Sequence, residues 1–536
     1  MKLRIRKPGC AREWAALILG AAVYALLYAL GSQIDQSGAT KAGATLVRFA
    51  GALPVAAAAL LLFFSLPAPC IKDRAPEKKF PTALAFAAIL ACYLPMFLTH
   101  YPGSFMYDTQ RQVFQIARNE YEMFHPLLHT LLIRFSLSFL DVLGSFEKCA
   151  ALYSVIQMTI VSLCFALLCA SAARCVSRRA GFGCAVFFAL YPAHMAFAGN
   201  CTKDGLFAAF FALFLALSME DAHFGGLPPA RRLAHVISGV LACLMRNNMI
   251  YAVIAWMFVL LLRRRRYLRL AAYCALVIVL SRAGNAGLAK MTNAAPGSAI
   301  EMFSVPIQQL SRARLLREDC FTESEKALMD EVFVDALYGE SDALYERYEP
   351  TLADPVKNYI DEELFKARLP QLAAMWASVG GKCPGVYLDA FLNLALPSLY
   401  PYSHYSVAQP YIETGLQPGV VTAPFGAPPM TSPSRFAGLR AWLYDNIFST
   451  GADHVPVLRL LFNTGAVYWL LLALFLKEMH RGAWRQMTML ALPLLLYATY
   501  LLGPVMQGRY LYPFICVLPL FVLRPAADCS EKEKNP

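Results

Sequence analysis

Four short clusters of charged and hydrogen-bonding residues interrupt a largely apolar sequence, and their residue types could bind and activate a substrate. The first is the stretch 101–133, which is rich in amides and carries an aspartate, arginines and two histidines. The others are a Lys-Asp pair, an Arg-Asn-Asn run and a late Gly-Arg-Tyr run. Ionisable groups beside membrane-length apolar stretches are costly, so they usually have a partner or a function. The candidate functional residues are Asp108, Arg111, His125, Lys203, Asp204, Arg246, Asn247 and Arg509.

These residues suggest acid–base chemistry combined with anion binding. Asp108 is predicted to lie near a helix start, where a carboxylate can act as a general base or can simply stabilise the helix N-terminus. The guanidinium of Arg246 suits a phosphate or a carboxylate, and Asn247 adds neutral donors. The adjacent Lys203 and Asp204 could contact a substrate or merely neutralise one another.

A metal site is the alternative that the histidines raise. His125 and His129 are four residues apart, so on a helix they would share a face. That spacing can bind zinc, but neither an HExxH run nor a nearby cysteine pair accompanies it. We therefore predict that no cofactor is required, and a divalent metal ion is not favoured.

The elements that position these residues are predicted to be membrane-spanning helices. Apolar residues make up 58% of the 536 residues and charged residues 16%, and the mean hydropathy is +0.47. About twelve runs approach the roughly 20 apolar residues that a helix needs to cross a bilayer, which predicts an all-α polytopic membrane protein. The predicted spans are 14–30, 46–66, 80–98, 149–172, 181–197, 205–218, 233–245, 249–262, 270–287, 457–476, 487–502 and 510–523.

The distribution of basic residues predicts the topology. Lys and Arg lie in short runs between apolar stretches, so we interpret the net charge of +12 as a topology signal and expect no nucleic-acid partner. The chain is expected to be a multi-pass plasma-membrane protein with both termini cytoplasmic. Its predicted parts are a transmembrane module 1–288 with a first external loop 100–148 that contains interfacial helices, a mostly helical external segment 289–455, transmembrane helices 456–523 and a cytoplasmic tail 524–536.

This topology places the candidate residues on the external side. A transport pathway would also need polar residues near the middle of the bilayer or on both faces. The arrangement therefore favours a site that is reached from the external interface. A transporter or flippase of a lipid-linked glycan, a glycan polymerase or ligase, and a scaffold whose segment 289–455 binds a partner stay open as alternatives.

The 15 cysteines give no sign of a disulfide framework. Most of them lie inside apolar runs without CxxC spacing, and we interpret these as small core residues. Cys320 and Cys383 fall in the polar segment and could form a disulfide in an oxidising compartment.

Several of these motifs resemble a known superfamily. An aspartate in the first large external loop, the Lys-Asp pair, the Arg-Asn-Asn element and the GRYLYP run at 508–513 resemble the GT-C superfamily of integral membrane glycosyltransferases. The FSVPIQQLSRA run at 303–313 and the YEPTLADPVKNY run at 348–359 are similar to an uncharacterised bacterial membrane family allied to that superfamily. The resemblance extends over nearly the whole chain.

The resemblance implies a function for the candidate residues. GT-C members transfer a sugar from a polyprenyl phosphate to an acceptor at the external face, here a cell-envelope glycan, lipid or protein. The resemblance implies that Asp108 is the general base in an inverting displacement. It also implies that Lys203, Arg246 and Arg509 bind the lipid phosphate. Many relatives have paired carboxylates, whereas Thr109 follows Asp108 here. Two alternatives stay open: the catalytic carboxylate lacks a metal partner, or Glu122 supplies the second carboxylate.

Overall fold

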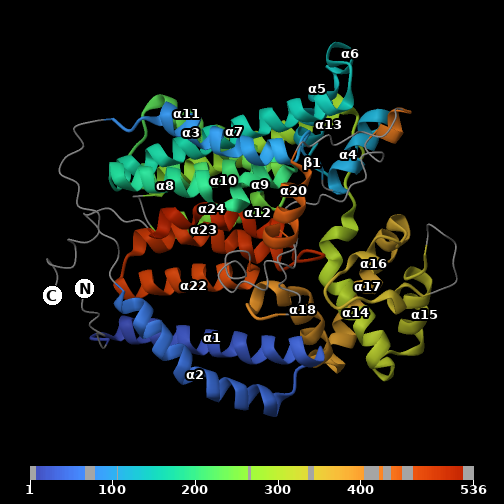
Figure 1. The fold of residues 1–536 in the computed structure, drawn as a ribbon. Helices are drawn as coiled ribbons and strands as arrows, with labels where there is room; N and C mark the ends of the chain where they lie inside the picture. Colours follow the sequence, from blue (N-terminus) through green and yellow to red (C-terminus); the bar gives the residue numbers. More distant parts are fainter. Residues whose placement is uncertain are drawn as a thin grey trace.

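The computed structural model describes residues 8–66, 79–105, 107–263, 267–335, 343–403, 422–426, 436–448 and 463–522 of the chain. The predicted cytoplasmic tail 524–536 and the basic residues of segments 1–7 and 71–78 lie outside these ranges. Helices form most of the described residues, which confirms the predicted all-α class. They run roughly side by side in layers, with a separate helical group at one end (Figure 1).

Six helices are long and apolar enough to cross a membrane. By length and composition they support the predicted membrane protein, because each carries an apolar stretch of at least 18 residues. They are α1 (Ala11–Ser37), α2 (Ala42–Ser65), α3 (Thr82–Thr99), α7 (Phe146–Cys175), α10 (Lys203–Phe224) and α13 (Leu268–Thr292).

The predicted count of about twelve spans is not confirmed. The predicted span 181–197 is divided into α8 (Arg178–Leu190) and α9 (Pro192–Gly199), which meet at an angle of 60°. Tyr191 is extended there because the residue before a proline disfavours helical geometry. The other predicted spans coincide with helices of 14 to 18 residues, most of them short for a bilayer core. These are α11 (Pro229–Met245), α12 (Met249–Leu262), α22 (Thr464–Arg481), α23 (Trp484–Tyr500) and α24 (Gly508–Val522).

The centre of the helix array is α10. Of its apolar window 89% is buried, against 6% for α2, which lies at the edge of the array. α10 packs against α7, α11 and α24. Its buried aromatic side chains Phe207, Phe211 and Phe214 fill the space between these neighbours. Both ends of α10 are therefore held in place by several other helices.

The predicted first external loop contains helices, as expected, and one short strand that was not predicted. The helices are α4 (Tyr107–Arg118), α5 (Leu127–Leu137) and α6 (Leu140–Leu143). Strand β1 (Ser104–Phe105) pairs in parallel with β2 (Asn200–Cys201), just before α10. Gly103 precedes β1 with φ +130°, and a Cβ at that position would lie only 2.3 Å from Ser154 Oγ. This turn therefore requires glycine.

The predicted external segment is mostly helical where it is described. Its helices pack around their own apolar core, which includes Ile307, Met329, Phe333 and Val379. Segments 336–342, 404–421, 427–435 and 449–462 lie outside the described residues. The elements are η2 (Ala299–Phe303), α14 (Ser304–Leu316), η3 (Glu318–Cys320), α15 (Glu323–Val332), η4 (Leu344–Arg347), α16 (Asp354–Lys357), α17 (Glu362–Lys382), α18 (Pro384–Leu399), η5 (Ala423–Phe425), α20 (Ala437–Leu443) and η6 (Tyr444–Phe448).

Candidate functional site

The pairing of β1 with β2 brings two aspartates together. The register aligns Ser104 with Asn200 and Phe105 with Cys201. Each strand is followed at once by a helix, so the same register aligns Asp108, in the first turn of α4, with Asp204, in the first turn of α10. The hydroxyl of Thr109 donates to the carbonyl oxygen of Cys201 at 2.5 Å and fixes α4 against β2.

Asp108 lies between two cations. Its Oδ2 accepts a hydrogen bond from Lys203 Nζ and another from Arg509 Nη1, the latter at 2.9 Å. Burial by itself would raise the pKa of Asp108, but the charges of Lys203 and Arg509 outweigh burial and hold the pKa well below its usual range. The carboxylate is therefore ionised and ion-paired at neutral pH.

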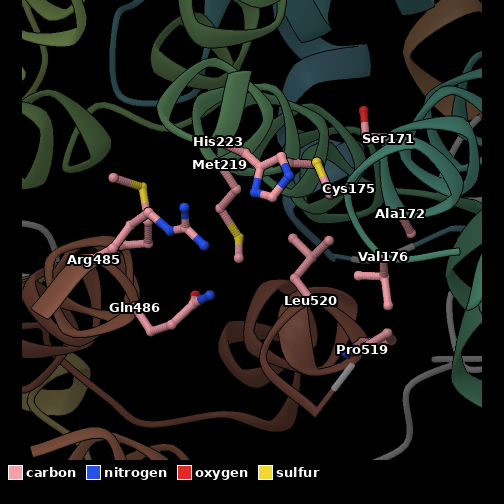
Figure 2. Close-up of a pocket in the computed structure, with 12 residues that line it drawn as sticks. Ser171, Ala172, Cys175, Val176, Met219, His223, Arg485, Gln486, Pro519 and Leu520 are labelled. Carbon is pink, nitrogen blue, oxygen red and sulfur yellow. The ribbon is translucent and has the colours of Figure 1, made fainter. Parts of the chain in front are cut away.

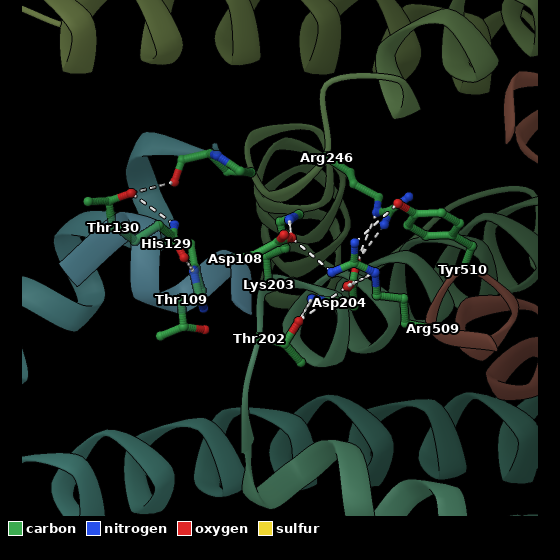
Figure 3. Close-up of polar contacts among 12 residues, drawn as sticks. Asp108, Thr109, His129, Thr130, Thr202, Lys203, Asp204, Arg246, Arg509 and Tyr510 are labelled. Atoms are coloured by element: carbon green, nitrogen blue, oxygen red, sulfur yellow. Dashed lines mark hydrogen bonds and ion pairs between the residues drawn. The ribbon is translucent and has the colours of Figure 1, made fainter. Parts of the chain in front are cut away.

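Asp204 forms the second ion pair. Its Oδ1 accepts from Nη2 and Nε of Arg246 at 2.7 and 3.0 Å, and its Oδ2 lies 3.9 Å from Nε of Arg509. Its side chain is only 1% exposed, so it would be costly to leave without these cations. Arg509 thus bridges Asp108 and Asp204 (Figure 3).

We call Asp108, Lys203, Asp204, Arg246 and Arg509 the Asp108 cluster. It contains three cations and two carboxylates, all with side chains no more than 14% exposed. One positive charge is therefore not neutralised within the cluster. A phosphate monoanion would balance the charges of these five residues.

Aromatic rings orient two of the cations. The guanidinium of Arg246 lies 4.4 Å from the ring centre of Tyr510 and 4.9 Å from that of Tyr500. Arg509 Nη2 donates to the Tyr510 hydroxyl at 3.3 Å. These contacts stabilise the cations in a buried position and restrict how far they can turn.

The remaining candidate residues lie around this cluster with different contacts. Nε2 of His125 is buried and has no hydrogen-bond partner within the described parts of the chain. Burial lowers the pKa of His125 to about 3, and the charge of Lys203 acts in the same direction, so this imidazole is neutral. Arg111 stacks on Phe124, with its guanidinium 5.1 Å from the ring centre. Asn247 is exposed at the end of α11.

His129 belongs to a separate buried network. Its Nδ1 lies 2.8 Å from Gln112 Oε1 and its Nε2 lies 2.7 Å from the Tyr153 hydroxyl. That hydroxyl donates to Gln157 Oε1 at 2.7 Å. Gln157 Nε2 donates in turn to the carbonyl oxygen of Phe197 at 2.9 Å, just before β2. Because both ring nitrogens of His129 are engaged, a zinc ion on the predicted histidine pair would have to displace one of these contacts.

Sequence reasoning missed the residues that support the cluster. Tyr500, Tyr153 and Gln157 were not among the candidates, although all three are buried and polar. Gln157 offered a signal, because a glutamine inside a predicted span needs a partner there. The two tyrosines offered none, since tyrosine is also common at membrane interfaces.

A second ionic group lies at the opposite end of α10. Glu220 Oε1 accepts from Arg174 Nε at 2.7 Å, and Asp221 Oδ2 accepts from Arg269 Nη2 at 2.8 Å. A pocket beside it is lined by His223 and Arg485 among others (Figure 2). Its volume of about 40 Å³ holds a few water molecules and not a sugar. These charges tie helix ends together, so ionisable residues are found at both ends of the array.

The cysteines of the helix array match their interpretation as core residues. Cys164, Cys169, Cys184 and Cys274 are buried free thiols. Cys320 and Cys383 are also free and buried. Burial raises the pKa of the Cys383 thiol to about 11, and the neighbouring Cys320 thiol acts in the same direction. Among the residues that the structure describes, no group of three or more His, Cys, Asp or Glu side chains is placed to hold a metal ion.

Comparisons with known proteins give a family and no activity. No curated protein and no solved structure matches the chain. The profile of one family of unknown function, DUF6020, matches residues 121–535. The matched residues include Lys203, Asp204, Arg246 and Arg509 and begin after Asp108. Since the match covers well over half of the chain, the protein belongs to DUF6020, a family of unknown function.

Proposed function

We propose that the protein is a membrane glycosyltransferase that moves a sugar from a polyprenyl-phosphate donor to a hydroxyl group of a cell-envelope glycan, lipid or protein. The Asp108 cluster is the observation that carries this proposal. It combines carboxylates with an excess of cations at one end of an array of apolar helices. The cations suit the donor phosphate and a surrounding bilayer suits the polyprenyl chain. The site faces the extracytoplasmic side.

The donor phosphate binds the three cations of the cluster. Lys203 and Arg509 contact Asp108 from different elements, and Arg246 approaches from the end of α11. Groups that are fixed before the reaction stabilise charge as it develops, without reorganising at that moment. The cations therefore stabilise the phosphate as it leaves with the electron pair of the broken bond.

Asp108 accepts the proton of the acceptor hydroxyl. The acceptor oxygen forms a bond to the anomeric carbon as the bond from that carbon to the phosphate oxygen breaks, and the configuration inverts. Paired with Lys203 and Arg509, Asp108 is a weak base because these two cations lower its pKa. A bound phosphate competes for the same two cations and so raises the basicity of Asp108. Donor binding thereby activates the base.

The test is sugar transfer by the purified protein in liposomes. A panel of radiolabelled polyprenyl-phosphate sugars serves as donor and a membrane extract as acceptor. We expect transfer from one donor, and loss of transfer in Asp108→Asn. The matched control is Asp141→Asn, which makes the same change in the first turn of α6, at an exposed position outside the cluster. Absence of transfer together with movement of the lipid-linked sugar across the bilayer would replace this proposal by a flippase.

A further inference from the structure

An apolar groove lies between α1, α2 and α22, away from the Asp108 cluster. Its volume is about 800 Å³, within the range of pockets that bind ligands. Its lining comes from these three helices and Tyr402 and shares no residue with the cluster. Figure 1 shows α1 and α2 at the edge of the helix array opposite α4 and α5.

The groove lies along α2, which packs against α1 and is otherwise largely exposed at the edge of the array. Only Leu60 and Phe64 of this helix are buried. The face that α2 turns toward α1 and α22 includes Gly51, Ala52 and Ala59, whose small side chains leave the space open. Atoms that line an apolar space without an occupant lose van der Waals contacts on that side. In a bilayer, hydrocarbon chains of lipids can fill such a space.

One end of the groove is polar and cationic. Arg48 lines it together with Tyr28 and Tyr402. Arg48 Nη1 and Nη2 donate to Ser32 Oγ and Gln36 Oε1, both at 2.7 Å, and both acceptors are neutral. No carboxylate forms an ion pair with Arg48 in the described ranges of the chain. Its charge is thus available to an anion.

The tyrosines show which depth of the bilayer this end occupies. Tyr28 and Tyr402 are 38% and 61% exposed. Tyrosine gathers where the bilayer meets water, so its ring rests against hydrocarbon and its hydroxyl reaches the headgroups. An arginine beside two such tyrosines suits the level of the headgroups. The groove is therefore amphipathic in the same sense as a lipid molecule.

The groove is long enough to hold an acyl chain along α2. Arg48 and Phe63 line its two ends on α2. With a rise of 1.5 Å per residue, the helix covers about 22 Å between them. That length exceeds the hydrocarbon thickness of one leaflet, which is about 15 Å. At the far end Phe63 and Leu60 of α2 line the groove, and Lys477 of α22, which is not part of the lining, lies over the Phe63 ring at 4.5 Å.

We propose that this groove binds one anionic phospholipid of the surrounding bilayer. Its phosphate pairs with Arg48 and one acyl chain follows α2 toward Phe63. The occupant is a bilayer lipid and not the polyprenyl donor, because a donor held here would keep its phosphate away from the Asp108 cluster. The bound lipid stabilises the α1–α2 hairpin against the rest of the array. This site does not depend on the proposed transferase activity.

Native mass spectrometry of the purified protein tests the proposal. The protein is titrated with phosphatidylglycerol or phosphatidylcholine of identical chains, and bound lipid is counted. We expect phosphatidylglycerol to bind about fivefold more tightly, as one arginine near a headgroup gives. Arg48→Gln should abolish this preference. Ala59→Trp should fill the groove and remove the bound lipid. Ala58→Trp, on the exposed outer face of α2, is the matched control and should behave as the unchanged protein.

Several outcomes would overturn the proposal. Equal affinity for the two headgroups in the unchanged protein would remove the role of Arg48. Equal effects of tryptophan at Ala58 and at Ala59 would remove the groove as the binding site. Displacement of phosphatidylglycerol by polyprenyl phosphate would make the donor the occupant. A change of oligomeric state in Ala59→Trp would make a second copy of the chain the occupant.

Discussion

Replacing Asp108 by asparagine should tighten the binding of a lipid phosphate while it abolishes transfer. Asp108 accepts hydrogen bonds from Lys203 and from Arg509, the latter at 2.9 Å, and a phosphate must compete for both. A hydrogen bond to a charged group contributes about 1.5–3 kcal/mol. We place each bond of the aspartate near the upper end of this range and each bond of an asparagine near the lower end, a difference of about 1 kcal/mol for each of the two bonds. Asparagine therefore weakens the competition by about 2 kcal/mol, which corresponds to an about 30-fold lower Kd.

The assay is titration calorimetry of the purified protein in detergent with polyprenyl phosphate that carries no sugar. Unchanged protein, Asp108→Asn and Asp141→Asn are compared at one salt concentration, because exposed charges are screened by salt. Asp141→Asn, an exposed position outside the cluster, should leave the Kd unchanged. Weaker binding by Asp108→Asn would refute the reasoning, since it would mean that Asp108 organises the cations for the phosphate and does not compete with it.

Three further predictions concern stability. Asp204→Asn should destabilise the protein by about 3–5 kcal/mol because it leaves the buried Arg246 without its carboxylate. A thermal melt should show a lower midpoint, and an unchanged midpoint would contradict this prediction. The pKa of His125 is lowered to about 3 in the folded state, so below about pH 6.5 the unfolded state binds a proton that the folded state does not, and stability should fall by up to about 1.4 kcal/mol per pH unit. His125→Gln should make the melting midpoint depend less on pH between pH 7 and pH 4. An unchanged pH dependence of the midpoint would show that His125 is not the group responsible. Cys320 and Cys383 should form a disulfide under mild oxidation, and this bond should stabilise the folded protein by about 4 kcal/mol because it closes a long loop. Mass spectrometry of the unreduced protein should detect the disulfide, and Cys383→Ser is the control.

Local reasoning identified most of the charged residues that the structure brings together. The aspartate after a helix break, the Lys-Asp pair and two isolated arginines were recognised because charge beside an apolar run is expensive. The structure brings Asp108, Lys203, Asp204, Arg246 and Arg509 into one cluster. Asn247 is exposed, and Arg111 stacks on Phe124 with no ion pair to a carboxylate in the described ranges. Their proposed contacts to a substrate stay predictions.

The helix count is the part of the fold prediction that the structure does not confirm. An apolar run predicts a helix, but it does not decide whether that helix is long enough to cross the bilayer. Pro192 divides one predicted span into two helices at an angle of 60°. α12 and α24, with 14 and 15 residues, are shorter than a span although their composition is apolar.

The sequence by itself determined that the chain forms apolar helices and that a few charged residues beside them need partners. Both follow from the cost of placing polar groups in hydrocarbon, which is a property of each residue and its neighbours along the chain. Only the tertiary structure decided which charges pair. The parallel register of β1 and β2 aligns Asp108 with Asp204, and Arg509 in the first turn of α24 lies between these two carboxylates. These contacts join segments far apart in the chain, so no local pattern encodes them.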